Sequence, residues 1–159
     1  MKAIEHIVVP VDFYTHSDLQ AGFALAIAAT FGARITFVHI MRRVVDYTDF
    51  DPDTLARLGE NLAAHADRKM KDFLRNLDKG KVTCRGEVLG GEPAEAILTF
   101  ADQHNADMII LSTHGAQGFE KILIGSIADR VIKGAECPCL VFNPFKKTWR
   151  YTTETGTKK

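Results

Sequence analysis

The sequence has no net charge, few cysteines and no long apolar run. Lys and Arg together number 20, as do Asp and Glu, so the formal net charge is zero, which disfavours a general nucleic-acid or anionic-membrane surface. No apolar stretch approaches the roughly 20 residues of a membrane span, and the first residues lead into a strand pattern rather than a signal peptide. Three cysteines, an odd number, do not make a disulfide framework, and a reducing cytoplasm is the simplest location. We therefore expect a cytoplasmic protein that binds neither nucleic acid nor membrane.

Common catalytic and nucleotide-binding motifs are also missing. There is no Gly-x-Gly-x-x-Gly and no Gly-x4-Gly-Lys-Ser/Thr, so neither the usual dinucleotide-binding fold nor a Walker-type NTPase is supported. His39 and His114 lack a spaced set of Cys, His or carboxylate partners, so we predict no metal site. Cys137 and Cys139 are not a Cys-x-x-Cys pair, and the thiols are expected to be buried or half-buried. Because no Ser-His-Asp or Cys-His arrangement is evident, we predict no catalytic residues.

The sequence does contain an alternation of strand-like and helix-like segments within 159 residues, a length typical of one domain. We expect a domain over residues 1–143 and a loosely ordered tail over residues 144–159. Short apolar runs predict strands at 4–11, 34–40, 82–89, 108–111 and 138–142. Helical spacing predicts helices at 19–31, 52–78, 93–104 and 126–133. This alternation indicates a parallel α/β sheet with helices on both faces.

Local signals predict where these helices begin and which faces are buried. Ser17 with Gln20, and Ser126 with Asp129, resemble capping boxes, so both serines are expected to be N-caps. Asp51 is expected to cap the second helix, which has proline at its first position. One apolar stripe of that helix is predicted to lie in the core: Leu55, Leu58, Leu62, Ala66, Met70, Phe73, Leu74 and Leu77.

The stretch from Ala106 to Val131 combines a short buried strand, a loop with glycines at 115, 118 and 125, and the start of a helix. Such an arrangement offers backbone N–H groups and the positive end of a helix dipole to a phosphate. Alternatively, the glycines only allow a long loop to turn, and the spacing alone does not separate these interpretations. In parallel sheets ligands bind at the carboxyl ends of strands, where the strand order reverses. We therefore expect the loops at 10–12, 39–41 and 112–125 to converge.

Four segments, in this order, resemble the universal stress protein family over about residues 3 to 143. They are a strand ending in Pro-x-Asp, a strand ending near a histidine, a Gly-x-Pro turn and a glycine-rich segment: Ile7 to Asp12, Phe37 to Ile40, Gly91 to Pro93, and Ser112 to Ser126. The resemblance implies an open five-stranded parallel sheet, with strand order 3-2-1-4-5, of the adenine-nucleotide alpha-hydrolase-like type.

ATP-binding members of the family are described by Gly-x2-Gly-x9-Gly-Ser/Thr. Gly115, Gly125 and Ser126 match the last three defined positions, whereas Ser112 stands at the first glycine. That position approaches the ribose in ATP-binding relatives. A serine there either crowds the sugar or donates a hydrogen bond to one of its oxygens.

The resemblance implies a site for ATP, with or without Mg²⁺, or for a related adenine nucleotide. It assigns Asp12 to hydrogen bonds with the sugar, and Val11 and Ile40 to the adenine slot, with Leu111 nearby. The glycines and the start of the last helix would present backbone N–H groups to the phosphates. The full set implied for the site is Pro10, Val11, Asp12, Ile40, Leu111, Ser112, Gly115, Gly125, Ser126 and Ile127.

The resemblance also implies a function and an assembly. The function is stress response through nucleotide-dependent interactions with an unidentified protein partner, without turnover of a metabolite. Members commonly dimerise by antiparallel pairing of the last strand, which predicts a homodimer through Cys139 to Phe142, an apolar edge open to such pairing. Alternatively, the tail at 144–159 covers this edge and leaves a monomer. A nucleotide-independent interaction module and a slow ATPase remain alternative functions.

Overall fold

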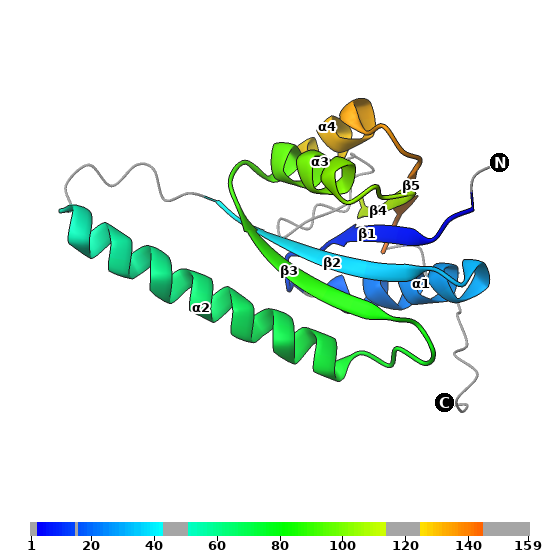
Figure 1. The fold of residues 1–159 in the computed structure, drawn as a ribbon, viewed down its shortest axis with the longest axis horizontal. Helices are drawn as coiled ribbons and strands as arrows, with labels where there is room; N and C mark the ends of the chain where they lie inside the picture. The colour runs from blue at the N-terminus through cyan, green and yellow to red at the C-terminus, as the bar shows by residue number, and fades with distance from the viewer. Residues whose placement is uncertain (1–2, 15, 43–50, 114–124, 145–159) are drawn as a thin grey trace.

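The computed structural model describes residues 3–14, 16–42, 51–113 and 125–144. Within these residues five parallel strands form one sheet in the order β3-β2-β1-β4-β5, which confirms the predicted fold and strand order (Figure 1). The elements, in chain order, are β1 (His6–Pro10), α1 (Ser17–Phe31), β2 (Arg34–Met41), α2 (Pro52–Asn76), β3 (Cys84–Gly90), α3 (Pro93–Gln103), β4 (Met108–Ser112), α4 (Ser126–Gly134) and β5 (Cys139–Phe142). No helix of the described ranges is long and apolar enough to cross a membrane.

Helices cover both faces of the sheet, α1 and α2 on one and α3 and α4 on the other (Figure 1). Successive strand residues point to opposite faces, so Ile7 and Val9 pack beneath α1 and α2 whereas Val8 packs beneath α3 and α4. The strands are buried on both faces, as their near-continuous apolar sequences predict. The largest fully buried side chains belong mostly to them, and include Phe37, Ile35, Ile109 and Ile110.

The strand order reverses between β1 and β4. β1 pairs with β2 along its whole length, from His6 to Pro10. Its pairing with β4 is restricted to Ile7 with Met108 and Val8 with Ile109. Backbone pairing between β1 and β4 therefore stops before their carboxyl ends, and the place where the strand order reverses is where a parallel α/β sheet offers a ligand site.

Two of the predicted helix caps are wrong. α1 is capped at His16 and α4 at Gly125, and neither helix has a side-chain cap hydrogen bond. Ser17 is instead the first helical residue of α1, because its hydroxyl donates to a carboxylate in the preceding loop. Ser126 is likewise the first helical residue of α4. The prediction for Asp51 is confirmed, since its Oδ1 accepts a hydrogen bond of 3.0 Å from Thr54 N.

The apolar stripe of α2 is only half core, which corrects the prediction. Its buried residues are Ala66, Met70 and Phe73, whereas Leu58 and Leu62 are 40% and 42% exposed. The 25 residues of α2 span about 37 Å. The neighbouring β3 has 7 residues, or about 23 Å, so the first half of α2 extends beyond the sheet (Figure 1).

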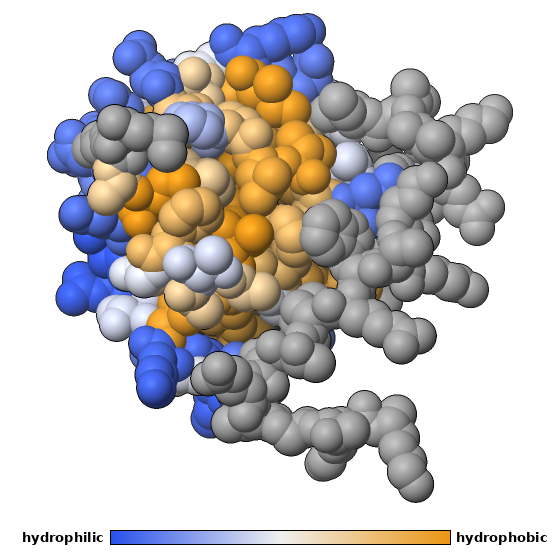
Figure 2. All heavy atoms as spheres, turned by 90° about the vertical axis from the view of Figure 1, so that its right-hand side faces the viewer, coloured by the Kyte–Doolittle hydropathy of each residue, from blue (hydrophilic) through white to orange (hydrophobic). Residues whose placement is uncertain are grey.

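β5 lies at one end of the strand order and pairs with β4 alone among the described strands. Val141 in the middle of this strand is 37% exposed. Figure 2 shows apolar atoms gathered over the middle of the face that lies on the right in Figure 1, the side on which β5 is seen. An edge with apolar side chains and unpaired backbone groups is suited to strand pairing with another chain.

His6 is a buried histidine of β1 with hydrogen bonds through both ring nitrogens. It is 3% exposed, with Nδ1 3.2 Å from His104 O and Nε2 2.8 Å from Thr36 Oγ1. A carbonyl only accepts, so Nδ1 carries the proton and Nε2 accepts from the Thr36 hydroxyl. Burial lowers the pKa of His6 below its usual 6.5. Protonation would therefore charge a buried ring and remove the acceptor for Thr36.

We predict that the free energy of unfolding falls as the pH is lowered through about 6.5. The unfolded chain then binds a proton that folded His6 does not, so the contribution of neutral His6 is fully present above this pH and is lost below it. Urea titrations at several pH values would measure this dependence. A His6→Gln variant should show a smaller loss than the parent, whereas His65→Gln, on the exposed part of α2, should show the parent's loss. An unchanged loss in His6→Gln would contradict this assignment.

Candidate functional site

The loop after β1 presents the carboxylate of Asp12 at the carboxyl edge of the sheet. Its Oδ1 accepts hydrogen bonds from Tyr14 N at 3.0 Å and from Ser17 Oγ at 2.9 Å. Within the described ranges Oδ2 accepts no hydrogen bond, and the side chain is partly exposed. One oxygen therefore fixes the orientation of the carboxylate, and the other is available to a hydroxyl of a ligand.

The backbone on either side of Asp12 is held against β2. Val11 N donates to Val38 O at 2.8 Å, and His39 Nδ1 donates to Val11 O at 2.9 Å. The ring of Phe13 lies on the His39 ring, with centroids 4.4 Å apart. Phe13 also has a φ of 62°, a conformation that costs free energy in a bulky residue and persists only where neighbours enforce it. The turn that carries Asp12 is thus pre-formed.

The start of α4 lies beside the end of β4. Gly125 N donates to Thr113 O at 3.0 Å, and Thr113 N donates to Phe142 O at 2.9 Å. The first intrahelical bond is from Asp129 N to Gly125 O, at 2.9 Å. The N–H groups of the first three helical residues, 126–128, therefore have no acceptor in the helix, and no side chain of the described residues caps them. These donors and the helix dipole together favour an anion.

Gly125 adds space at this helix end. Its φ of −59° and ψ of 149° suit any residue, and among the residues that the structure describes a Cβ there would meet only Thr113 O, at 3.5 Å. Neither the local backbone nor close packing within the described chain thus requires glycine. A side chain at this position would instead occupy the space in front of the three N–H groups.

Apolar side chains from three elements lie on the face covered by α3 and α4. Leu111 is 3% exposed, and Ile40 and Ile127 are half-buried and pack against the same core cluster. Val11, which was expected to line the adenine slot with Ile40, packs in the core on the opposite face. The structure therefore brings together Ile40, Leu111 and Ile127, but not the side chain of Val11.

The remaining predicted residues lie at strand ends or outside the described residues. Pro10 is the last residue of β1. Ser112, the last residue of β4, is half-buried and in register with Phe142. Gly115 lies outside the described residues. Ser17 and His39 also hold the loop that carries Asp12. The sequence did not predict this role, because Ser17 resembled a helix cap and His39 a single histidine.

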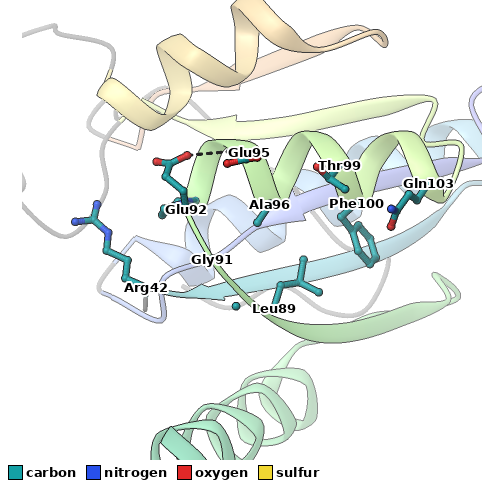
Figure 3. A pocket seen from close by; sticks show the side chains of 11 residues that line it. Arg42, Leu89, Gly91, Glu92, Glu95, Ala96, Thr99, Phe100 and Gln103 are labelled. Carbon is teal, nitrogen blue, oxygen red and sulfur yellow. Dashed lines mark hydrogen bonds between the residues drawn. The ribbon is translucent and has the colours of Figure 1, made fainter. Parts of the chain in front are cut away.

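A groove of about 910 Å³ lies to one side of these residues, along α3 and the end of β3 (Figure 3). Its lining includes Arg42, Leu89, Thr99 and Gln103, and none of the predicted site residues that the structure describes. At one end of it Glu92 caps α3 through Glu95 N, and its Oε1 lies 2.8 Å from Arg130 Nη1 on α4. The amino end of α3 is thus linked to the middle of α4, but the groove is separate from the described residues of the predicted site.

Metal and thiol chemistry receive no support from the described residues. No three His, Cys, Asp or Glu side chains in those ranges are grouped as a metal site would need. Burial raises the pKa of the Cys84 and Cys139 thiols, which keeps them protonated and weakly nucleophilic at neutral pH.

Comparisons with known proteins agree with this fold. A sequence model of the universal stress protein family matches residues 3–143. Universal stress protein MJ0531 of Methanocaldococcus jannaschii is 34% identical over 145 residues, which are 89% of this chain and 83% of that protein.

Two solved structures have the same fold. Universal stress protein UspA from Lactobacillus plantarum superimposes with a TM-score of 0.73 at 25% identity, over 89% of this chain and 99% of that one. A universal stress protein from Archaeoglobus fulgidus in complex with dAMP gives a TM-score of 0.56 at 22% identity, over 88% of this chain and 98% of that one.

Proposed function

The chain belongs to the universal stress protein family, and we propose that it binds ATP or a related adenine nucleotide where β1, β2 and β4 end. One observation supports this most: within the described residues, the N–H groups at the start of α4 have no side-chain cap and one carboxylate oxygen of Asp12 accepts no hydrogen bond, and both lie where β1 and β4 end. The first suits phosphate and the second suits a sugar hydroxyl. The complex of the Archaeoglobus fulgidus relative with dAMP supports an adenine nucleotide.

Each part of the nucleotide has residues of matching chemistry. Asp12 would accept hydrogen bonds from the sugar, and Ile40 and Leu111 would contact the adenine. The phosphates would lie against Gly125 and the N–H groups of residues 126–128, and Ser112 and Gly115 would complete the glycine-rich segment. Mg²⁺ would accompany the phosphates through water and phosphate oxygens, as it usually does.

We further propose that the protein acts in stress response as a cytoplasmic homodimer. The exposed apolar edge of β5 supports antiparallel pairing of Cys139 to Phe142 with the same segment of a second copy. Nucleotide binding would then alter how the dimer engages a protein partner, and hydrolysis would be slow or absent. The tail at 144–159 would lie outside the domain.

Calorimetric titration of the purified protein with ATP and Mg²⁺ tests the proposed function. We expect saturable binding with a dissociation constant below about 1 mM, which corresponds to roughly −4.1 kcal/mol, and weaker binding of GTP. Absence of binding at millimolar ATP would contradict the proposal and favour the nucleotide-independent module. Equal affinity for GTP would reject the adenine assignment. Turnover above background that Asp12→Ala abolishes would favour the slow hydrolase.

A further inference from the structure

Gln20 is a buried polar residue one turn into α1. It is 4% exposed, and a buried amide needs hydrogen-bond partners. Its Nε2 donates to Pro10 O and to Ile110 O, each at 3.1 Å. A side-chain amide has two N–H donors, so each strand receives one of them.

The two carbonyls belong to β1 and β4 at the point where these strands have stopped pairing. The last backbone pair between them is Val8 with Ile109. Beyond it, the described residues of the two strands form no further backbone pair, and the Gln20 amide bridges the strands instead. Gln20 therefore holds the carboxyl ends of β1 and β4 at a set spacing, and it also connects both of them to the first turn of α1.

Both halves of the proposed site lie only a few residues after these carbonyls along the chain. Pro10 precedes Asp12 by two residues, and Ile110 precedes Ser112 by two residues. Thr113 follows Ser112 and holds Gly125 through its carbonyl. A change in the spacing at Gln20 would therefore shift the sugar side of the site relative to its phosphate side.

We infer that Gln20 is a positioning residue that sets the distance between the sugar-binding and phosphate-binding halves of the nucleotide site, an inference that rests on the proposed function. It touches no part of the ligand. It acts by holding Asp12 and the start of α4 at the separation that one nucleotide spans. A purely structural Gln20 would support the fold but would not couple these two halves.

A double-mutant cycle separates these roles, with ATP affinity measured by calorimetry or by competition. Gln20→Leu keeps a similar volume and removes both donors, and Asp12→Asn keeps Oδ1 as an acceptor for Tyr14 and Ser17 while weakening the sugar contact. We expect Gln20→Leu to weaken ATP binding at least about tenfold in the parent and less than about threefold in Asp12→Asn, because misalignment matters only while both halves bind. Gln103→Leu, on the exposed end of α3, is the control and should leave the ATP affinity unchanged in both backgrounds.

Each outcome has one meaning. Equal losses in both backgrounds, or no loss in the parent, would overturn the inference and leave the proposed function intact. An Asp12→Asn variant that binds ATP as the parent does would also overturn it, because Asp12 would then not be the sugar contact. A parent that binds no ATP would instead contradict the proposed function. Urea unfolding of every variant at the temperature of the titration confirms that folded protein is being compared.

Discussion

Replacing Gly125 with valine is expected to weaken ATP binding at least about 100-fold, or by roughly 2.7 kcal/mol. The added side chain would fill the space in front of the uncapped N–H groups of α4. Hydrogen bonds to charged groups contribute about 1.5–3 kcal/mol each, so losing access to two of them is sufficient. The fold should be unaffected, since the φ and ψ of Gly125 suit valine and, among the described residues, a Cβ meets only Thr113 O at 3.5 Å.

Two glycine-to-alanine variants calibrate this effect. Gly125→Ala adds a single methyl group and should give an intermediate loss of affinity. Gly59→Ala lies inside α2, where a Cβ would meet nothing within 4 Å, so affinity should stay at the parent value. It should also raise the free energy of unfolding by about 0.5–1 kcal/mol. Unchanged ATP binding by folded Gly125→Val would exclude this helix end as the phosphate site.

The second large effect is expected at the edge of the sheet, where Val141→Pro should convert the proposed homodimer into a monomer. Ile109 N donates to Pro138 O at 3.0 Å and Thr113 N donates to Phe142 O at 2.9 Å. In a parallel sheet the backbone groups of alternate residues point to opposite neighbours. Since the carbonyls of Pro138 and Phe142 point toward β4, the N–H of Val141 points away from it. Proline would remove this outward donor and obstruct a new neighbouring strand, but it would leave the β4–β5 bonds in place.

A two-fold interface would contain this substitution twice, so we expect the dimer dissociation constant to rise at least about 100-fold, or roughly 2.7 kcal/mol. Sedimentation velocity over a range of concentrations would measure it. Val141→Thr retains the N–H and the β-branched shape, and it should remain dimeric. A parent that is monomeric, or a Val141→Pro variant that is as dimeric as the parent, would contradict dimerisation through β5.

The strands and helices could be predicted from the sequence because the apolar patterns that indicate them are periodic and local. Buried strands such as Ile7 to Val9 are continuous apolar runs, and the helices between them show helical spacing. The strand order followed from the family resemblance rather than from the pattern. The exposure of Leu58 and Leu62 was not predictable, because it depends on where α2 ends relative to β3 and not on the stripe itself.

Only part of the site could be predicted from the sequence, because some of its contacts join residues far apart in the chain. Asp12 and Gly125 have motif signals at fixed spacing. Gln20, by contrast, has a local signal for helix capping, and its actual partners are 10 and 90 residues away. Ser17 was misread in the same way, since a carboxylate within the loop competed successfully with the helix for its hydroxyl. Tertiary hydrogen bonds of this kind leave no periodic trace in a single sequence.

The most direct test of the nucleotide site is an ATP titration of isotope-labelled protein followed by the backbone amide resonances. The account predicts that the largest shifts occur in two segments, Asp12 to Tyr14 and Ser126 to Ala128, which form the sugar and phosphate sides of the proposed site. Amides along the groove beside α3, such as those of Thr99 and Gln103, should change little. Shifts concentrated in that groove, or no shifts at millimolar ATP, would contradict it.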